Sequence, residues 1–401
     1  MPLVFKYDLG ITDQPVIGDP IPVILDLASN NGMLLAGCSD QYVRRWNLAG
    51  ASSLASVATP HTPDAIAMAD SVNLACLSFN STTPFLVNTS SGAVTSLTAT
   101  SACYQSGKGQ QIAGIVSSNV AMGTSATAGS VNLINSSLVT SNLITVTGLG
   151  SAHAVTVIAK PSSAHWLIGT NDGRVMEVDQ SGAVSNTITL PTTPNCGTPP
   201  VHIVSGMSMA NGNLLVSTLG GTMFAYTYPS TLVQTLPLGL PTGTTGWVMT
   251  PSANGLTALF PSYPKSAGGC VNMIDFATSP LRFVDYFYGP ENDPIVAGGF
   301  DATTSSLYFG LATKVRVINC NMLNTSTYTD HIQNPNGTDV SARSIIMHYP
   351  KQGMAKVVAD ETIASGQQTV TVPYAGEEYI SIVLRGTPFS TELVDVRRVT
   401  T

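Results

Sequence analysis

Two histidines occupy equivalent positions in this sequence and are the first candidates for chemistry. His153 and His202 each stand at the start of a predicted apolar strand, one repeat apart. If such strands end around a central opening, imidazoles there could bind a metal ion or a substrate. The other histidines are scattered without ligand-like spacing. Two turn histidines without a ligand are the simpler interpretation, so we assign no metal site.

Carboxylates are the second candidates, because a glycosidase needs two of them about 5 to 10 Å apart across a cleft. Four could serve: Asp64, Asp172, Glu291 and Asp293. Glu291 and Asp293 are the closest two, but prolines flank both and indicate a rigid loop. No G-x-S-x-G, P-loop or H-E-x-x-H motif is present. We therefore predict no enzyme and assign no catalytic, cofactor-binding or metal-binding residue, and no cofactor.

A small aromatic cluster could stack against sugars. It consists of Phe283, Tyr286, Phe287 and Tyr288. An outer strand that covers its sheet explains these residues more simply, so we assign no sugar site to them.

The six cysteines lie far apart and form no C-x-x-C pair, which argues against zinc ligation and a thioredoxin-like motif. They are Cys38, Cys76, Cys103, Cys196, Cys270 and Cys320. Cys38 and Cys76 fall within apolar strands, where a cysteine is most often a small buried hydrophobe.

The composition is unusual in its low charge. Only 10% of the 401 residues are charged, against a usual share of about 25%, so solubility must come from Ser, Thr, Asn and Gly. This surface is typical of extracellular β proteins and virion parts. The net charge of -7 argues against a nucleic-acid-binding face. We expect no secretory signal peptide and no membrane span.

A repeat of about 45 residues positions these candidates. Seven apolar strands end in Asn, Asp or Thr, with spacings of 41, 47, 44, 48, 48 and 44 residues, at Asn47, Asn88, Asn135, Asp179, Thr227, Asp275 and Asn319. That period is the length of a four-stranded propeller blade. We interpret the endings as turn caps that bond their own backbone.

Further signals recur inside each repeat. The Asn171-Asp172-Gly173 turn predicts a tight hairpin in which Asp172 and Gly173 both have positive φ. The second strand ends in a small residue, at Gly37, Gly123, Gly169, Ser217 and Gly310. A missing side chain there would let neighbouring blades approach closely, although a glycine could equally mark a bulge.

These repeats resemble the seven-bladed propeller superfamilies of WD40 and YVTN-like proteins over roughly residues 20 to 322. The Arg45-Trp46-Asn47-Leu48 stretch is similar to the end of a WD40 blade. Val178-Asp179 and Ile274-Asp275 are similar to the Ile-Asp ending of YVTN blades. The Gly-His pair of WD40 repeats and the Trp docking motifs of quinoproteins are absent.

The predicted fold class is all-β, a seven-bladed propeller over residues 1–340 with a small C-terminal β module over 341–401. Residues 341–401 hold 12 of the 39 charged residues. A closed propeller avoids unpaired edges. We expect the N-terminal strand 3–9 to close the last blade, with segment 325–331 as its competitor.

The function that we expect is that of a non-enzymatic virion structural or assembly protein, such as a tail hub, nozzle, fibre or decoration component of a tailed phage. The chain resembles propeller-containing phage tail proteins in fold and composition. Its expected partners are other virion proteins and copies of itself, and its expected location is the virion, after synthesis in the host cytoplasm. The alternatives are a propeller enzyme of the lactonase sort or a lectin for host-surface glycans, acting at the central opening or top-face loops, or an intracellular WD40-like platform.

Overall fold

The structure is a computed structural model. It describes residues 4–12, 22–98, 101–104, 112–115, 120–135, 137, 139–159, 164–191, 203–210, 213–220, 222–229, 231–237, 246–248, 256–261, 270–275, 282–288, 296–301, 303–304, 306–319, 326–331, 342–348, 356–363, 367–372, 378–385 and 392–400.

The chain forms two compact units, and each is described by itself. One unit is Phe5–Asn319, and the other is Cys320–Thr401 with Met1–Val4. The division lies about 20 residues before the boundary at 340 expected from charge content. The reason is that Ser326–His331 (β29) pairs with Gln367–Val372 (β32), inside the second unit.

In the described part of the first unit, strands β1 to β28 form seven four-stranded sheets, numbered here by chain order. Sheet one contains β2 (Ile24–Asn30), β3 (Met33–Cys38), β4 (Tyr42–Asn47) and β5 (Ser52–Ala58). Sheet two contains β6 (Ala65–Met68), β7 (Asn73–Leu77), β8 (Phe85–Asn88) and β9 (Val94–Ser96). Sheet three contains β10 (Ile112–Ile115), β11 (Val120–Thr124), β12 (Ser130–Ile134) and β13 (Ser141–Thr145).

Sheet four contains β14 (Val155–Ala159), β15 (Trp166–Thr170), β16 (Arg174–Val178) and β17 (Val184–Thr189). Sheet five contains β18 (Val204–Ala210), β19 (Asn213–Thr218), β20 (Thr222–Thr227) and β21 (Thr231–Pro237). Sheet six contains β22 (Gly246–Val248), β23 (Leu256–Pro261), β24 (Cys270–Asp275) and β25 (Arg282–Tyr288). Sheet seven contains β26 (Ala297–Asp301), β27 (Ser306–Gly310), β28 (Lys314–Asn319) and β1 (Val4–Gly10).

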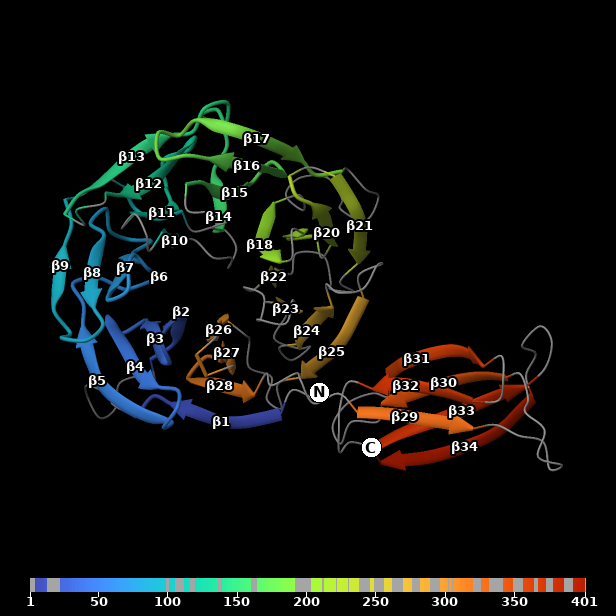
Figure 1. Cartoon of the computed structure of the whole chain (residues 1–401). Helices are drawn as coiled ribbons and strands as arrows, with labels where there is room; N and C mark the ends of the chain where they lie inside the picture. The colour runs from blue at the N-terminus through green and yellow to red at the C-terminus, as the bar shows by residue number, and fades with distance from the viewer. Residues whose placement is uncertain are drawn as a thin grey trace. The chain divides into compact units, whose positions relative to one another are not determined.

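The sheets stand in a ring, and their innermost strands are β2, β6, β10, β14, β18, β22 and β26 (Figure 1). Innermost strands of consecutive sheets contact one another from β26 through β2 and on to β22. Each strand of sheets one to six pairs with the next along the chain, antiparallel, as in a meander. This arrangement is an all-β propeller, and it confirms the predicted fold class.

The N-terminal strand closes the last sheet, as predicted. β1 lies beside β28 and completes the order β1-β28-β27-β26. The competing segment 325–331 instead forms β29 and pairs with β32. Without β1, β28 would present an unpaired edge to solvent.

The hydrophobic core lies between neighbouring sheets rather than within any one of them. Sheets one and two share a cluster that includes Leu35, Val43, Phe85 and Val87, each fully buried. Similar clusters join sheets two to three, three to four and four to five. Burial of one such side chain contributes roughly 1.5 to 3 kcal/mol, so each sheet depends on its neighbours.

The glycines that end the second strands allow this close packing at Gly37 and Gly169, and a register shift in the pairing also lies opposite each of them, so the packing and the bulge interpretations both apply. A β-carbon at Gly37 would lie 2.2 Å from the carbonyl oxygen of Pro63, which leads into sheet two. At Gly169 it would lie 2.4 Å from Val204 of sheet five. No side chain fits at either position without displacing the neighbouring sheet.

Four of the seven strand-ending residues cap their turns, as predicted, and the side chains of Asp275 and Asn319 lie outside the described residues. Oδ1 of Asn88 accepts the backbone N–H groups of Ser90 at 3.1 Å and Ser91 at 2.9 Å. Equivalent bonds to the following turn are made by Asn47, Asn135 and Asp179. These acceptors satisfy turn donors that would otherwise need water.

The second unit contains a four-stranded sheet and a two-stranded sheet. The first has the order β31 (Lys356–Ile363), β30 (Ala342–His348), β33 (Glu378–Arg385) and β34 (Glu392–Thr400). The second pairs β29 with β32. All of these pairings are antiparallel.

Candidate functional site

The best-defined polar network of the propeller surrounds the hairpin between β15 and β16. Three residues, Asn171, Asp172 and Gly173, connect these strands. Only Gly173 has a positive φ, of 80°, so the expectation of positive φ at both Asp172 and Gly173 is wrong. Three-residue hairpin loops need the left-handed conformation only at the last position, where glycine stands.

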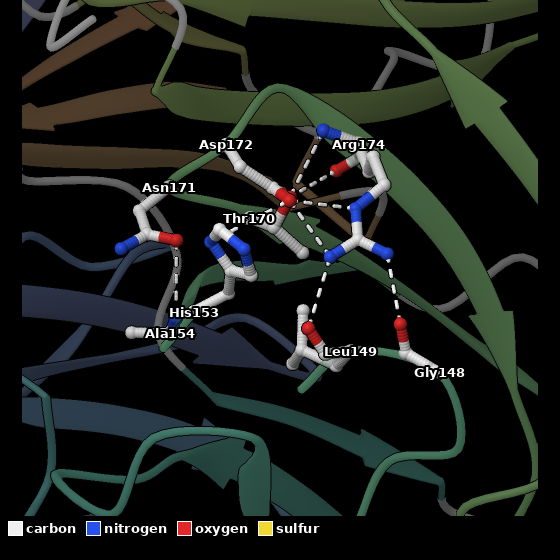
Figure 2. A network of polar contacts seen from close by, with 8 residues as sticks. All are labelled: Gly148, Leu149, His153, Ala154, Thr170, Asn171, Asp172 and Arg174. Atoms are coloured by element: carbon white, nitrogen blue, oxygen red, sulfur yellow. Dashed lines mark hydrogen bonds and ion pairs between the residues drawn. The ribbon is translucent and has the colours of Figure 1, made fainter. Parts of the chain in front are cut away.

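Asp172 is the centre of this network (Figure 2). Its Oδ2 accepts a hydrogen bond from Nε of Arg174 at 2.8 Å, and Nη2 of the same guanidinium lies 2.7 Å away. Its Oδ1 accepts the hydroxyl of the buried Thr170 at 2.5 Å. Nδ1 of His153 approaches Oδ2 at 3.5 Å.

These contacts set the charge state of Asp172. Partial burial raises the pKa of its carboxyl, but hydrogen bonds from Arg174 and Thr170, with the charges of Arg174 and His153, lower it further. The net result is a pKa below the ordinary value for aspartate. The carboxylate is therefore ionised at neutral pH.

Arg174 extends the network to the connection between sheets three and four. Nη1 donates to the carbonyl oxygen of Gly148 at 2.9 Å, and Nη2 donates to that of Leu149 at 3.0 Å. The adjacent Asn171 accepts the backbone N–H of Ala154 at 3.0 Å through its Oδ1. The hairpin of sheet four is thereby bonded to the segment that enters the same sheet.

The network suits mechanical fixation better than catalysis. Both oxygens of Asp172 are occupied by donors of the same sheet, and the Thr170 hydroxyl donates to the carboxylate instead of facing His153. A nucleophile needs a base that can accept its proton. The same pairing recurs in sheet one, where Arg44 forms a bidentate pair with Asp40 at 2.8 and 2.7 Å.

Asp64, the other described carboxylate candidate, forms its hydrogen bonds outside this network. Asp64 accepts the backbone N–H of Phe79 at 2.7 Å and the hydroxyl of Ser78 at 3.2 Å, within sheet two. Burial raises its pKa above the ordinary value. His202, Glu291 and Asp293 lie outside the described residues, as do the side chains of Phe283, Tyr286, Phe287 and Tyr288.

The described thiols and acids give no sign of a metal centre. Cys38, Cys76 and Cys103 are buried, which confirms the interpretation of the first two as small hydrophobes. Over the described residues, no group of three or more His, Cys, Asp or Glu side chains could hold a metal ion. Nor does any helix in this part of the chain have the length and hydropathy of a membrane span.

Asp26 is a polar residue that the sequence analysis missed. It lies on the innermost strand of sheet one, where the pairing with β3 shifts register. Oδ2 accepts the backbone N–H of Ile66 in sheet two at 2.8 Å, and Oδ1 accepts that of Leu27 at 2.9 Å. Burial raises the pKa of Asp26 to about 7, although both N–H bonds lower it. A lone carboxylate in an apolar strand carries no motif that could have singled it out.

The comparisons with known proteins support the fold. No known sequence family matches the chain, and no curated protein sequence does. Among solved structures, the chain is similar to the β-propeller domain of Cps50 (Swd1) from Myceliophteria thermophila, with a TM-score of 0.61 and 11% identity over 79% of this chain and 99% of that domain. It is also similar to U3-55K, with a TM-score of 0.59 and 11% identity over 78% and 98% of the two chains.

Proposed function

We propose that this chain is a non-enzymatic assembly protein that uses a seven-bladed propeller as a rigid interaction scaffold, and that it is a structural component of a virus particle, most simply of a phage tail. The observation that carries the proposal is the chemistry of the outermost strands. Those of sheets one to five, β5, β9, β13, β17 and β21, contain no charged residue.

Outer strands of a propeller each present one row of unpaired backbone groups. Monomeric proteins commonly protect such edges with lysine or other charges. Here they carry Ser, Thr, Val and Leu, and β21 exposes the neighbouring side chains of Leu232 and Val233 at 41% and 49%. An uncharged edge of this kind can accept a strand from another copy or another protein by β-augmentation.

The polar network of sheet four supports a scaffold role as well. Asp172 accepts from Arg174 and lies close to His153, and Arg174 also donates to two backbone carbonyls of its own propeller. Side chains used in this way stiffen the turns that they cross-link. A rigid body with neutral edges suits a spacer in a large assembly.

Two measurements on the full chain test this proposal. Sedimentation and light scattering should reveal self-association that rises with concentration, and mass spectrometry of purified particles from the native source should find the chain with other virion proteins. Val233→Lys in β21 should weaken self-association. Val139→Lys is the matched control, because Val139 is 55% exposed but lies in a turn. A chain that stays monomeric and is absent from particles contradicts the proposal.

A further inference from the structure

Among the propeller arginines whose side chains are described, one differs from the other three in how its charge is balanced. Arg44, Arg174 and Arg316 are each held by an aspartate, at distances of 2.7 to 2.8 Å. Arg45, which is only 9% exposed, is held by two carbonyl groups instead. Nε donates to Ala55 at 2.8 Å, and Nη1 donates to Thr89 at 2.7 Å.

No carboxylate in the part of the chain that the structure describes pairs with this guanidinium. Burial alone lowers the pKa of Arg45 from its ordinary value. Carbonyl dipoles satisfy two of the five N–H groups that a guanidinium carries, and they supply no negative charge. An arginine that is removed from water normally gains a carboxylate or phosphate partner in bidentate geometry.

Nη2 of Arg45 lies near the turn after β8, where sheet one meets sheet two. A β-carbon at Gly92 would lie 3.8 Å from this Nη2 and 3.4 Å from a methyl group of Val57, so a methyl group fits there in ordinary contact. Gly92 ends the turn after β8, where the exposed Ser90 and Ser91 add hydroxyl groups. Leu54, which is 39% exposed, pairs directly with Arg45 across β4 and β5. Directly opposed residues share one face of a sheet.

We propose that the Nη2 edge of Arg45, beside Gly92 and Leu54, is a binding site for an oxyanion, either a carboxylate from an acidic protein segment or a free tetrahedral anion. The oxygen atoms of the bound anion would accept hydrogen bonds from Nη2, the guanidinium nitrogen whose N–H groups donate to neither Ala55 nor Thr89. The bound anion would neutralise the charge of Arg45, the one described arginine of the propeller that pairs with no described carboxylate.

The first test compares the full chain with Arg45→Met, each titrated with sodium sulfate, sodium acetate or a poly-glutamate peptide at constant ionic strength, while Tm is followed. The wild-type chain should show a saturable rise in Tm with at least one probe, and Arg45→Met should lose it. Arg44→Met is the matched control, and it should keep the response. Saturation by sulfate identifies a free-anion site, and tighter saturation by the peptide identifies a protein carboxylate.

The second test does not depend on the stability of the Arg45→Met variant. Leu54→Glu places a carboxylate opposite Arg45 at an exposed position, so it should raise Tm at low salt. It should also weaken the response to every anion by at least about tenfold, as expected when one charge-assisted pair already fills the site. Leu54→Gln controls for the change in size and should leave the response intact. A wild-type chain without a saturable response, or a Leu54→Glu variant that keeps the full response, overturns the proposal.

Discussion

Asp8 in β1 and Arg316 in β28 form a bidentate pair, with Nε to Oδ1 and Nη2 to Oδ2 distances of 2.8 Å each, across 308 residues of sequence. Lys314 approaches the same carboxylate at 3.5 Å. Burial raises the pKa of Asp8, but the bonds and charges of Arg316 and Lys314 bring it below its ordinary value. The pair therefore fastens the closing strand to the last sheet.

Asp8→Ala should lower the free energy of unfolding by about 2 kcal/mol, the usual contribution of charged hydrogen bonds. The reason is that the Arg316 side chain, 6% exposed, would lose its carboxylate. Lys314→Ala should cost less than about 1 kcal/mol, because its ion pair is longer and more exposed. Urea unfolding of the two variants and of the double mutant measures the coupling. Equal effects of both single substitutions would contradict the assignment.

Gly37→Ala should destabilise the propeller strongly, by about 3 kcal/mol or more, because its β-carbon would meet backbone and not a flexible side chain. Gly10→Ala in β1 is the matched control, since no atom lies within 4 Å of a β-carbon there. Thermal unfolding of both variants measures the difference. A small effect at Gly37 would show that sheets one and two can separate without loss of packing.

The stabilisation from Asp172 should disappear in acid. Its pKa is lowered in the folded state, so the carboxylate stabilises the propeller above the ordinary pKa of 3.8, and this contribution is lost as the pH falls through the folded value. Asp172→Asn should be less stable than wild type at pH 7, and the gap should narrow toward pH 3. Urea midpoints at a series of pH values test this; a gap that is independent of pH contradicts it.

Asp26 should make the propeller less stable as the pH rises, in a range above that of Asp172. Its pKa rises from 3.8 to about 7 on folding, so between these values the folded state holds a proton that the unfolded state has released. Stability then falls as the pH rises, with a limiting slope of about 1.4 kcal/mol per pH unit for one proton, and levels off above pH 7. Asp26→Asn should flatten the slope between pH 4 and 7, and an unchanged slope would exclude Asp26 as its source.

The turn caps and the close-packed glycines of each repeat could be predicted because they depend on residues that are near one another in the sequence. Asn88 bonds to N–H groups two and three positions further on, and a capping side chain with a fixed reach recurs at a fixed period. Gly37 and Gly169 follow the same logic, since each ends the second strand of its repeat. The ring and its closure by β1 follow from that period and from the need to cover the last edge.

The polar network around Asp172 and the division between the two units could not be predicted in the same way. Arg174 donates to the carbonyl oxygens of Gly148 and Leu149. Because every residue has a backbone carbonyl, the sequence does not indicate which of them accepts such a bond. Asp26 meets Ile66 only after two sheets have packed. The pairing of β29 with β32 joins segments on both sides of residue 340, so a change in charge content does not mark the end of the first unit. His202 lies outside the described residues, so the equivalence of its position to that of His153 stays a prediction.

Closure by the first strand also sets the order of events during synthesis. β1 leaves the ribosome before its partner β28, because Arg316 in β28 lies 308 residues after Asp8 in β1. At about 5 to 20 residues per second, translation keeps that strand waiting for on the order of 15 to 60 seconds. During this interval the edge of β1 is open to chaperones or to another nascent chain. The last blade is therefore the step at which one polypeptide either completes itself or exchanges a strand with its neighbour.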